Sequence, residues 1–240
     1  MKQSCEINQQ LPPLNVIACG ALAKELLALK ALNQWQEMQI SCLPAKYHNT
    51  PSLIPGAVDK KIDQIKAQNN GKILVAYGDC GTGGLLDAVI EKHNILQKDH
   101  VKRLLGAHCY QFFAGNKAFT NLQENEIGSF YVTDFLVKQF ESYVWKSLGL
   151  DKNPELLELY FSNYKRLVFL AQTNNQELTE LAKNCAKRLN LSFERIYTGY
   201  GDLNTKLNQF KTHEIPVLEI VSPNAHKNVP YNSPSKLYAS

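Results

Sequence analysis

Short apolar runs alternate along the chain with longer segments in which apolar residues recur at helical spacing. LNVIAC at 14–19 is such a run, and ALAKELLALKALNQW follows with a helical repeat. The same alternation predicts further strands at 38–43, 71–77, 166–171, 193–198 and 217–221, and helices at 54–67, from 85 onward and at 175–189. Alternating elements of this kind favour an α/β fold with a mostly parallel sheet and helices on both faces.

The middle of the chain has a different pattern. FYVTDFLVKQFESYVWKSLGL and PELLELYFSNY, within 127–164, predict two helices separated by Gly149 and Pro154, and 108–119 is interpreted as a loop leading into a helix. We expect one α/β domain over 14–221, with halves 14–125 and 165–221 bridged by helices. Tyr-Gly-Asp at 77–79 and again at 200–202 is either a trace of duplication or chance. The Pro-, Asn- and Ser-rich segment 222–240 predicts a flexible tail.

Composition limits the class of protein. The chain is 44% hydrophobic and 20% charged, and its net charge of +4 comes from lysines scattered among acidic residues, which does not favour nucleic-acid binding. No apolar stretch approaches the ~20 residues of a membrane span, and residues 1–15 lack the apolar core of a signal peptide. We therefore expect a cytoplasmic protein with a small-molecule substrate and neither a nucleic-acid nor a membrane partner. In that compartment the six cysteines indicate free thiols, metal ligands or catalytic groups more than disulfides.

The segment AYGDCGTGG at 76–84 ends a predicted buried strand in a tight turn. Its glycines permit positive φ and close backbone approach. The turn and the helix start behind it also suit a phosphate or carboxylate of a ligand, which makes Gly81, Thr82, Gly83 and Gly84 the predicted cofactor-binding residues. The turn is not a P-loop, because no Gly-Lys-Ser/Thr follows it.

Four cysteines are expected on one rim of the sheet. Cys19, Cys42 and Cys80 end different predicted strands, and Cys109 lies in a loop at a comparable position. For any one of them, an inert buried thiol is the common alternative. Two histidines close to them, His48 and His108, favour a shared metal site. The first-choice ligands are Cys19, Cys80 and Cys109, with Cys42, His48 and His108 as a fourth ligand or as surrounding groups.

Ligand type leaves the chemistry open between zinc and an iron–sulfur cluster, because neither is supported by a CxxC pair. A third reading is metal-free. Cys80 then attacks an electrophile, its pKa lowered by the helix N-terminus, and His108 takes its proton. Asp79, His48 and Tyr200 are the predicted catalytic residues, as acid/base or hydroxyl groups.

Several segments resemble the bacterial and archaeal family catalogued as domain of unknown function 1638. They are ACGALAKE (18–25), CLPAKYHNTP (42–51), ILVAYGDCGTGGLLD (73–87), HCYQFFAG (108–115), FYVTDFLVKQF (130–140), ELYFSNYKRLVFLAQ (158–172) and TGYGDL (198–203). The resemblance runs from about residue 14 to about 210. It implies no settled activity, and it associates the chain with genes for corrinoid-dependent methyl transfer. The resemblance thus implies a corrinoid or a methyl-transfer protein as the partner.

The residues and the resemblance together predict a metal-dependent transferase or lyase with a cysteine/histidine-ligated iron–sulfur or zinc centre at the carboxyl ends of the strands. Zinc suits activation of a substrate thiol, and a cluster with an open iron suits Lewis-acid chemistry. The alternatives are a metal- or corrinoid-binding accessory protein or metallochaperone, and the metal-free cysteine nucleophile. An enzyme should enclose its ligands in a pocket, whereas a chaperone should expose them.

Overall fold

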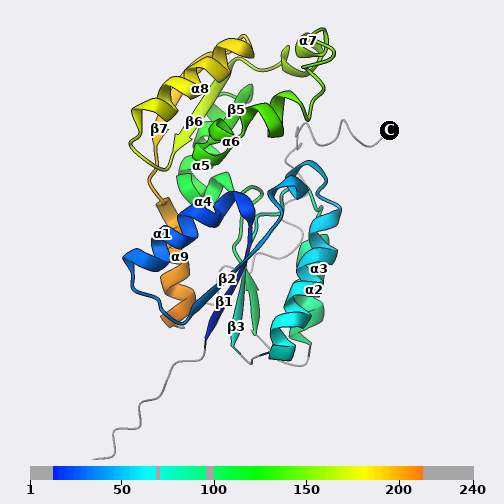
Figure 1. The fold of residues 1–240 in the computed structure, drawn as a ribbon, viewed down its shortest axis with the longest axis vertical. Helices are drawn as coiled ribbons and strands as arrows, with labels where there is room; N and C mark the ends of the chain where they lie inside the picture. Colours follow the sequence, from blue (N-terminus) through cyan, green and yellow to red (C-terminus); the bar gives the residue numbers. More distant parts are fainter. Residues whose placement is uncertain (1–12, 69–70, 96–99, 213–240) are drawn as a thin grey trace, which may run out of the picture.

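The computed structural model describes residues 13–68, 71–95 and 100–212, and these residues form two parallel sheets with helices packed around them (Figure 1). Sheet A has the order β2-β1-β3-β4, built from Leu14–Cys19 (β1), Met38–Leu43 (β2), Lys72–Ala76 (β3) and Val101–Arg103 (β4). Sheet B has the order β5-β6-β7, built from Ser129–Thr133 (β5), Arg166–Ala171 (β6) and Ser192–Tyr197 (β7). The expected α/β class is therefore confirmed.

Helices cover both faces of sheet A. Figure 1 shows α1 and α9 on one face and α2 and α3 on the other. Their bounds are Ala23–Leu32 (α1, after a short 3-10 turn at Gly20–Leu22), Leu53–Gln68 (α2), Leu85–Asn94 (α3) and Gly201–Thr212 (α9). A second 3-10 turn, Ala45–Asn49, follows β2. Because β1 and β3 are buried on both faces, they appear in the sequence as continuous apolar runs.

Sheet B is covered on both faces as well. Side chains of β6 alternate between two clusters: Leu167, Phe169 and Ala171 pack on one side, and Val168 and Leu170 on the other. The first cluster includes residues of α6 (Asp134–Lys138), a π-helix (Glu141–Trp145), α7 (Leu156–Phe161) and α8 (Gln176–Arg188). The second includes residues of α4 (Tyr110–Ala114) and α5 (Asn116–Asn125).

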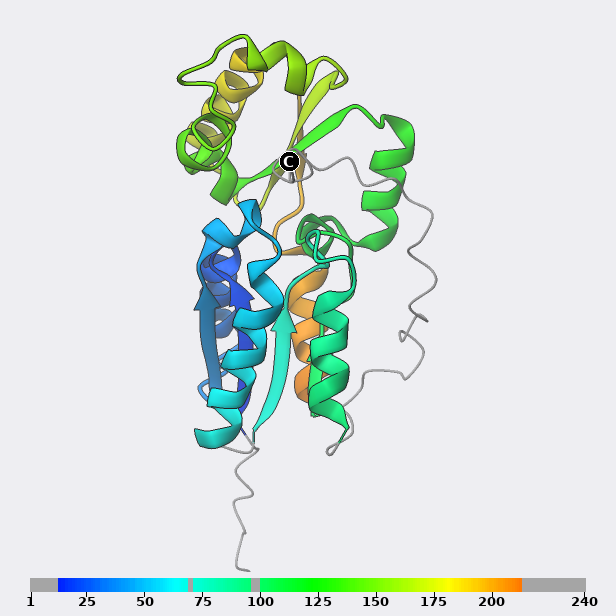
Figure 2. The ribbon, with the colours of Figure 1, turned by 90° about the vertical axis from the view of Figure 1, so that its right-hand side faces the viewer.

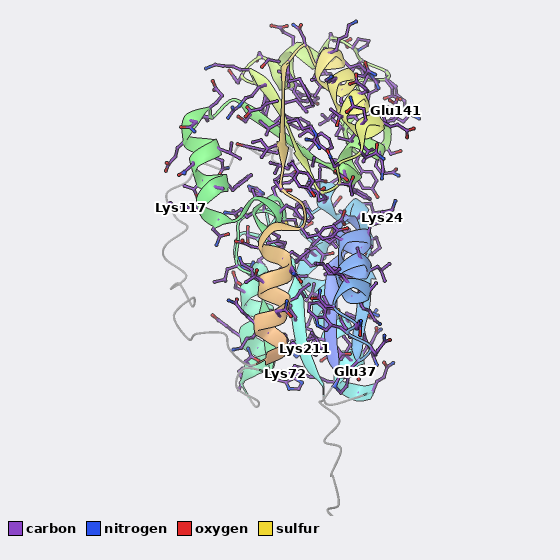
Figure 3. The ribbon with its side chains drawn as sticks, turned by 90° about the vertical axis from the view of Figure 1, so that its left-hand side faces the viewer. Lys24, Glu37, Lys72, Lys117, Glu141 and Lys211 are labelled. Carbon is purple, nitrogen blue, oxygen red and sulfur yellow. The ribbon has the colours of Figure 1, made fainter. Side chains whose placement is uncertain are left out.

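The last described helix returns to the first half of the molecule. Leu203, Leu207 and Phe210 of α9 belong to the core of sheet A. Lys72 Nζ also lies 5.9 Å from the Phe210 ring centroid, at the far end of the sheet where Lys72 and Lys211 are labelled in Figure 3. The chain therefore crosses between the halves twice, before β5 and after β7.

Two elements differ from the sequence-based expectation. β5 lies in the segment for which helices were expected, because FYVT has helix-like apolar spacing but consists of β-branched and aromatic residues that pair with β6. β4 was not expected at all, since it has only three residues at the sheet edge. The strand predicted at 217–221 and the tail predicted at 222–240 lie outside the described residues. Among the described helices, none combines the length and the hydropathy needed to cross a bilayer.

Candidate functional site

The turn after β3 is fixed to the loop after β4. The backbone N–H of Asp79 donates to Gly106 O and that of Cys80 to Ala107 O, each at 2.8 Å. Gly78 makes this approach feasible, because a Cβ atom at that position would lie 2.8 Å from the carbonyl carbon of His108. These contacts bring the loop that carries Cys109 against Cys80.

The two thiols are in contact. Cys80 Sγ and Cys109 Sγ lie 3.5 Å apart, and Cys80 adopts a positive φ of 49°, a conformation that costs free energy for any residue with a side chain. The hydrogen bond from the Cys109 thiol lowers the pKa of Cys80, and the same contact together with burial raises the pKa of Cys109. The pair therefore favours a thiolate on Cys80, and Cys109 holds the remaining proton.

A small cavity lies beside this thiol pair, between the half of the molecule that contains sheet A and the half that contains sheet B. Figure 2 shows the strands of sheet A running toward sheet B, so the carboxyl ends of β1 and β3 face the second half. The first half contributes Cys19, Ala21, Leu22, Ala45, His48, Ile54, Tyr77, Cys80, His108, Cys109, Tyr110 and Phe113 to the cavity wall, and the second half Thr133, Phe135, Leu136 and Tyr143. Its volume is about 40 Å³, enough for a few water-sized groups.

Burial sets the protonation of the other wall residues. It raises the pKa of the Cys19 thiol to about 11, and it lowers the pKa of the His108 imidazole to about 4, with His48 adding to the effect. Desolvation also lowers the pKa of His48, although this residue is exposed overall and so stands at the mouth of the cavity. Both imidazoles are therefore neutral near pH 7, the form that binds metals and accepts protons.

Asp79 occupies the glycine turn itself. Its carboxylate accepts hydrogen bonds from Thr82 Oγ1 at 2.8 Å, Gly84 N at 2.9 Å and Gly83 N at 3.2 Å. Burial opposes ionisation of Asp79, but these hydrogen bonds outweigh it and lower the pKa of the carboxyl. A ligand phosphate at Gly81–Gly84 would compete with Asp79 for these amides. The binding role of the turn and the acid/base role of Asp79 stay predictions.

The predicted residues divide into two groups. Five of them line the cavity together: Cys19, His48, Cys80, His108 and Cys109. Cys42 is an exposed residue of β2 beside Ala18, and Tyr200 packs against the core of sheet A; neither lines the cavity.

The predicted site residues leave out several wall residues, above all Tyr77, because Tyr200 is preferred as the hydroxyl group. The Tyr77 side chain is 1% exposed, and its hydroxyl has no hydrogen-bond partner among the described residues. Burial raises its pKa, and the neighbouring thiols add to the shift. The second half supplies Thr133, the N-cap of α6, and Tyr143, which the π-helix carries. Such π-helical turns are frequent at functional sites, but nothing in the sequence marks this one.

The ligand atoms around the cavity are more loosely arranged than the thiol pair. In the described ranges, Asp59, Asp63 and His93 form the one group of three His, Cys, Asp or Glu side chains whose ligand atoms all lie within 4.8 Å of one another. That group joins α2 to α3, and two lysines offset its negative charge. Lys92 Nζ lies 2.8 Å from Asp59, and Lys66 Nζ lies 3.4 Å from the His93 ring. Cys80 and Cys109 thus form a ready pair, and a third ligand would have to approach it.

Comparisons with known proteins add a family and no activity. The model of a family described as "Protein of unknown function (DUF1638)" matches residues 42–207. No curated protein and no solved structure matches the chain. The matched segment includes every cavity residue that follows β1 and its 3-10 turn.

Proposed function

The chain belongs to the DUF1638 family, and we propose that it is a metal-dependent enzyme in which Cys80 and Cys109 bind one ion at the cavity between the halves. The observation that carries the proposal is the 3.5 Å separation of the two sulfurs. Two thiolates bound tetrahedrally to one zinc, with bonds of about 2.3 Å, lie about 3.8 Å apart. In a cubane iron–sulfur cluster each cysteine binds a different iron, which holds the sulfurs farther apart. The spacing therefore supports a single ion such as zinc.

The remaining ligands come from the same wall. Cys19 and His108 line the same cavity, and either would have to approach the pair to supply a third thiolate or a neutral imidazole, both ordinary zinc ligands. The cavity beside Cys80 and Cys109 would give substrate access to an ion held there. When bound, the ion supplies Lewis-acid chemistry, which lowers the pKa of a substrate thiol or of water.

The protein groups around the ion have separate roles. His48, neutral and at the mouth, is suited to accept the proton that the substrate releases. Asp79 holds the turn that carries Cys80 through its bonds to Gly83 and Gly84. The side chains of Phe135 and Leu136 close the cavity from the second half and exclude water.

Burial of the ligands favours catalysis over metal transfer. Cys80 is 8% exposed, Cys109 is partly buried and the pair lines a cavity between the halves, whereas a metallochaperone needs ligands that a partner can reach.

The test is metal content after anaerobic purification. We expect about one zinc per chain in the wild type and in Cys185→Ala, a buried cysteine of α8 far along the chain from the site. Cys80→Ala and Cys109→Ala should lose the ion. Because Cys80 has a positive φ, Cys80→Gly provides a second thiol-free variant that keeps the turn without strain. Thermal unfolding of each variant verifies that it is folded.

Other outcomes overturn the proposal. Metal loss in Cys185→Ala as well, or retention in all variants, contradicts the assignment of ligands. Iron with inorganic sulfide would establish the cluster instead of zinc. A metal-free protein would favour the cysteine nucleophile, which the lowered pKa of Cys80 supports. In that case Cys109 is the hydrogen-bond donor to test, because His108, with a pKa of about 4, is a weak base.

A further inference from the structure

The Tyr77 hydroxyl is buried and has no well-aligned hydrogen-bond partner among the described residues. Its side chain follows β3, is 1% exposed and lines the cavity, and its Oη atom faces the Cys19 thiol but makes no hydrogen bond of normal geometry within the described ranges. A buried hydroxyl without a partner lowers stability, so native proteins seldom retain one without a reason. A ligand atom that accepts a hydrogen bond from the Tyr77 hydroxyl is such a reason.

Apart from the thiolates of Cys80 and Cys109, whose charges the proposed ion would offset, the cavity wall carries no charged side chain. None of its described residues is lysine, arginine, aspartate or glutamate. Asp79, whose charge acts on His108, turns its carboxylate to Thr82, Gly83 and Gly84 instead. A charged ligand entering here would lose its hydration without gaining an opposite charge.

The size of the cavity restricts the ligand further. About 40 Å³ encloses a heteroatom and one or two carbons, and a longer substituent would leave past His48. Ala21, Leu22, Ala45 and Ile54 surround the enclosed part with apolar surface. The site thus combines a soft thiol pair, a deeply buried hydroxyl donor at Tyr77 and a largely apolar wall.

We propose that the cavity binds a small uncharged thiol whose sulfur accepts a hydrogen bond from the Tyr77 hydroxyl. This rests on the proposed function, because the same sulfur takes the open position of the ion held by Cys80 and Cys109. A bound ion would lower the pKa of the thiol, His48 would pass the released proton to solvent, and Tyr77 would donate a hydrogen bond to the resulting thiolate. Tyr77 thereby selects and orients the ligand.

The experiment compares Tyr77→Phe with Tyr131→Phe. Tyr131 is a matched control, because its hydroxyl is also buried without a partner but lies in sheet B outside the cavity. Cobalt(II)-loaded protein is titrated with ethanethiol and with two charged thiols of similar length, mercaptoacetate and 2-aminoethanethiol, while the cobalt–thiolate absorption is recorded. Ethanethiol should bind at least tenfold more tightly than either charged thiol. Tyr77→Phe should weaken ethanethiol binding about tenfold, as expected for one hydrogen bond to a charged acceptor, and Tyr131→Phe should not.

Each further outcome is decisive. Equal affinity for charged and uncharged thiols, or an unchanged affinity in Tyr77→Phe, overturns the ligand proposal while leaving the metal in place. Protein that takes up no cobalt overturns the metal proposal instead. The ligand is then tested on fully reduced, metal-free protein by the rise in Tm that ethanethiol produces. A larger rise in wild type than in Tyr77→Phe supports the ligand, and equal rises reject it.

Discussion

At the residue scale, the thiol pair depends on a position that has no side chain. Gly78 lets the backbone after β3 reach the His108 backbone, and the hydrogen bonds of Asp79 and Cys80 to the β4 loop follow from that approach. A side chain at this position meets the main chain, which cannot move aside as a flexible side chain does.

We predict that Gly78→Ala destabilises the protein by about 1–3 kcal/mol, the usual cost of overpacking a closed site. Zinc content and the Cys80–Cys109 contact should be lost with it, because the β4 loop must retreat. Gly56→Ala is the control, since a Cβ at Gly56 in α2 meets nothing within 4 Å and alanine favours helix. Urea unfolding of both variants measures the difference. Equal stability of the two variants would contradict the role of Gly78.

At the element scale, the start of α6 is fixed by a buried carboxylate. Asp134 is 4% exposed, and it accepts hydrogen bonds from Gln172 N at 3.0 Å and from Thr173 Oγ1. Its own N–H donates to Gln172 Oε1 at 2.8 Å. The ends of β5 and β6 are thereby joined next to Thr133, Phe135 and Leu136, which form part of the second-half wall of the cavity.

We therefore expect Asp134→Asn to lower the free energy of unfolding by about 1–3 kcal/mol, because an amide offers one acceptor oxygen where the carboxylate offers two, so that either Gln172 N or Thr173 Oγ1 loses its acceptor. Asp151→Asn, at an exposed position, should change it by no more than about 0.5 kcal/mol. Urea denaturation monitored by circular dichroism compares them. If Asp134→Asn lowers the free energy of unfolding no more than Asp151→Asn does, the hydrogen bonds of Asp134 do not stabilise the junction between β5 and β6.

Burial explains which elements the sequence predicts well. β1, β3 and β6 are covered on both faces, so their apolar runs mark the strand ends closely, and with them the positions of Cys19 and Cys80. β5 has the same type of residues, but its helix-like spacing conceals a strand that pairing with β6 selects. The contributions of Thr133 and Tyr143 to the site could not be predicted because they depend on that strand.

The local sequence pattern could not predict the contact between Cys80 and Cys109 either. It follows from pairing of the three-residue β4 with β3 and from the fit at Gly78, both of which are tertiary effects. The same holds for the tyrosines. Tyr77 and Tyr200 stand in the same Tyr-Gly-Asp context, and only the fold directs Tyr77 to the cavity and Tyr200 to the core surface.

At the scale of the whole molecule, the two halves meet at a buried acidic residue. Glu25 of α1 is 6% exposed, and its Oε2 atom has no hydrogen-bond partner within the described residues. Burial raises the pKa of its carboxyl, and Asp134 across the seam adds to the shift. Lys24, labelled in Figure 3, and Lys138 oppose the shift, and Tyr200 also faces both carboxyls.

This arrangement predicts that the contribution of Glu25 to stability falls as pH rises. Above the ordinary value of 4.5, unfolded chains release the Glu25 proton first, so the folded state binds more protons until the pH exceeds its raised pKa. Glu25→Gln, which stays neutral, should match wild type near pH 4 and exceed it by about 1 kcal/mol at pH 7. Glu37→Gln, at an exposed position, is the control. Thermal unfolding across this pH range measures both, and a parallel pH profile for Glu25→Gln and wild type would refute the prediction.

The return of α9 to sheet A has a consequence for synthesis on the ribosome. The residues of sheet A leave the exit tunnel first, yet their core lacks Leu203, Leu207 and Phe210 until nearly the last described residue has been made. Sheet B, whose strands end at Tyr197, has its own core complete before then. The half that is translated first is therefore the half whose core is completed last.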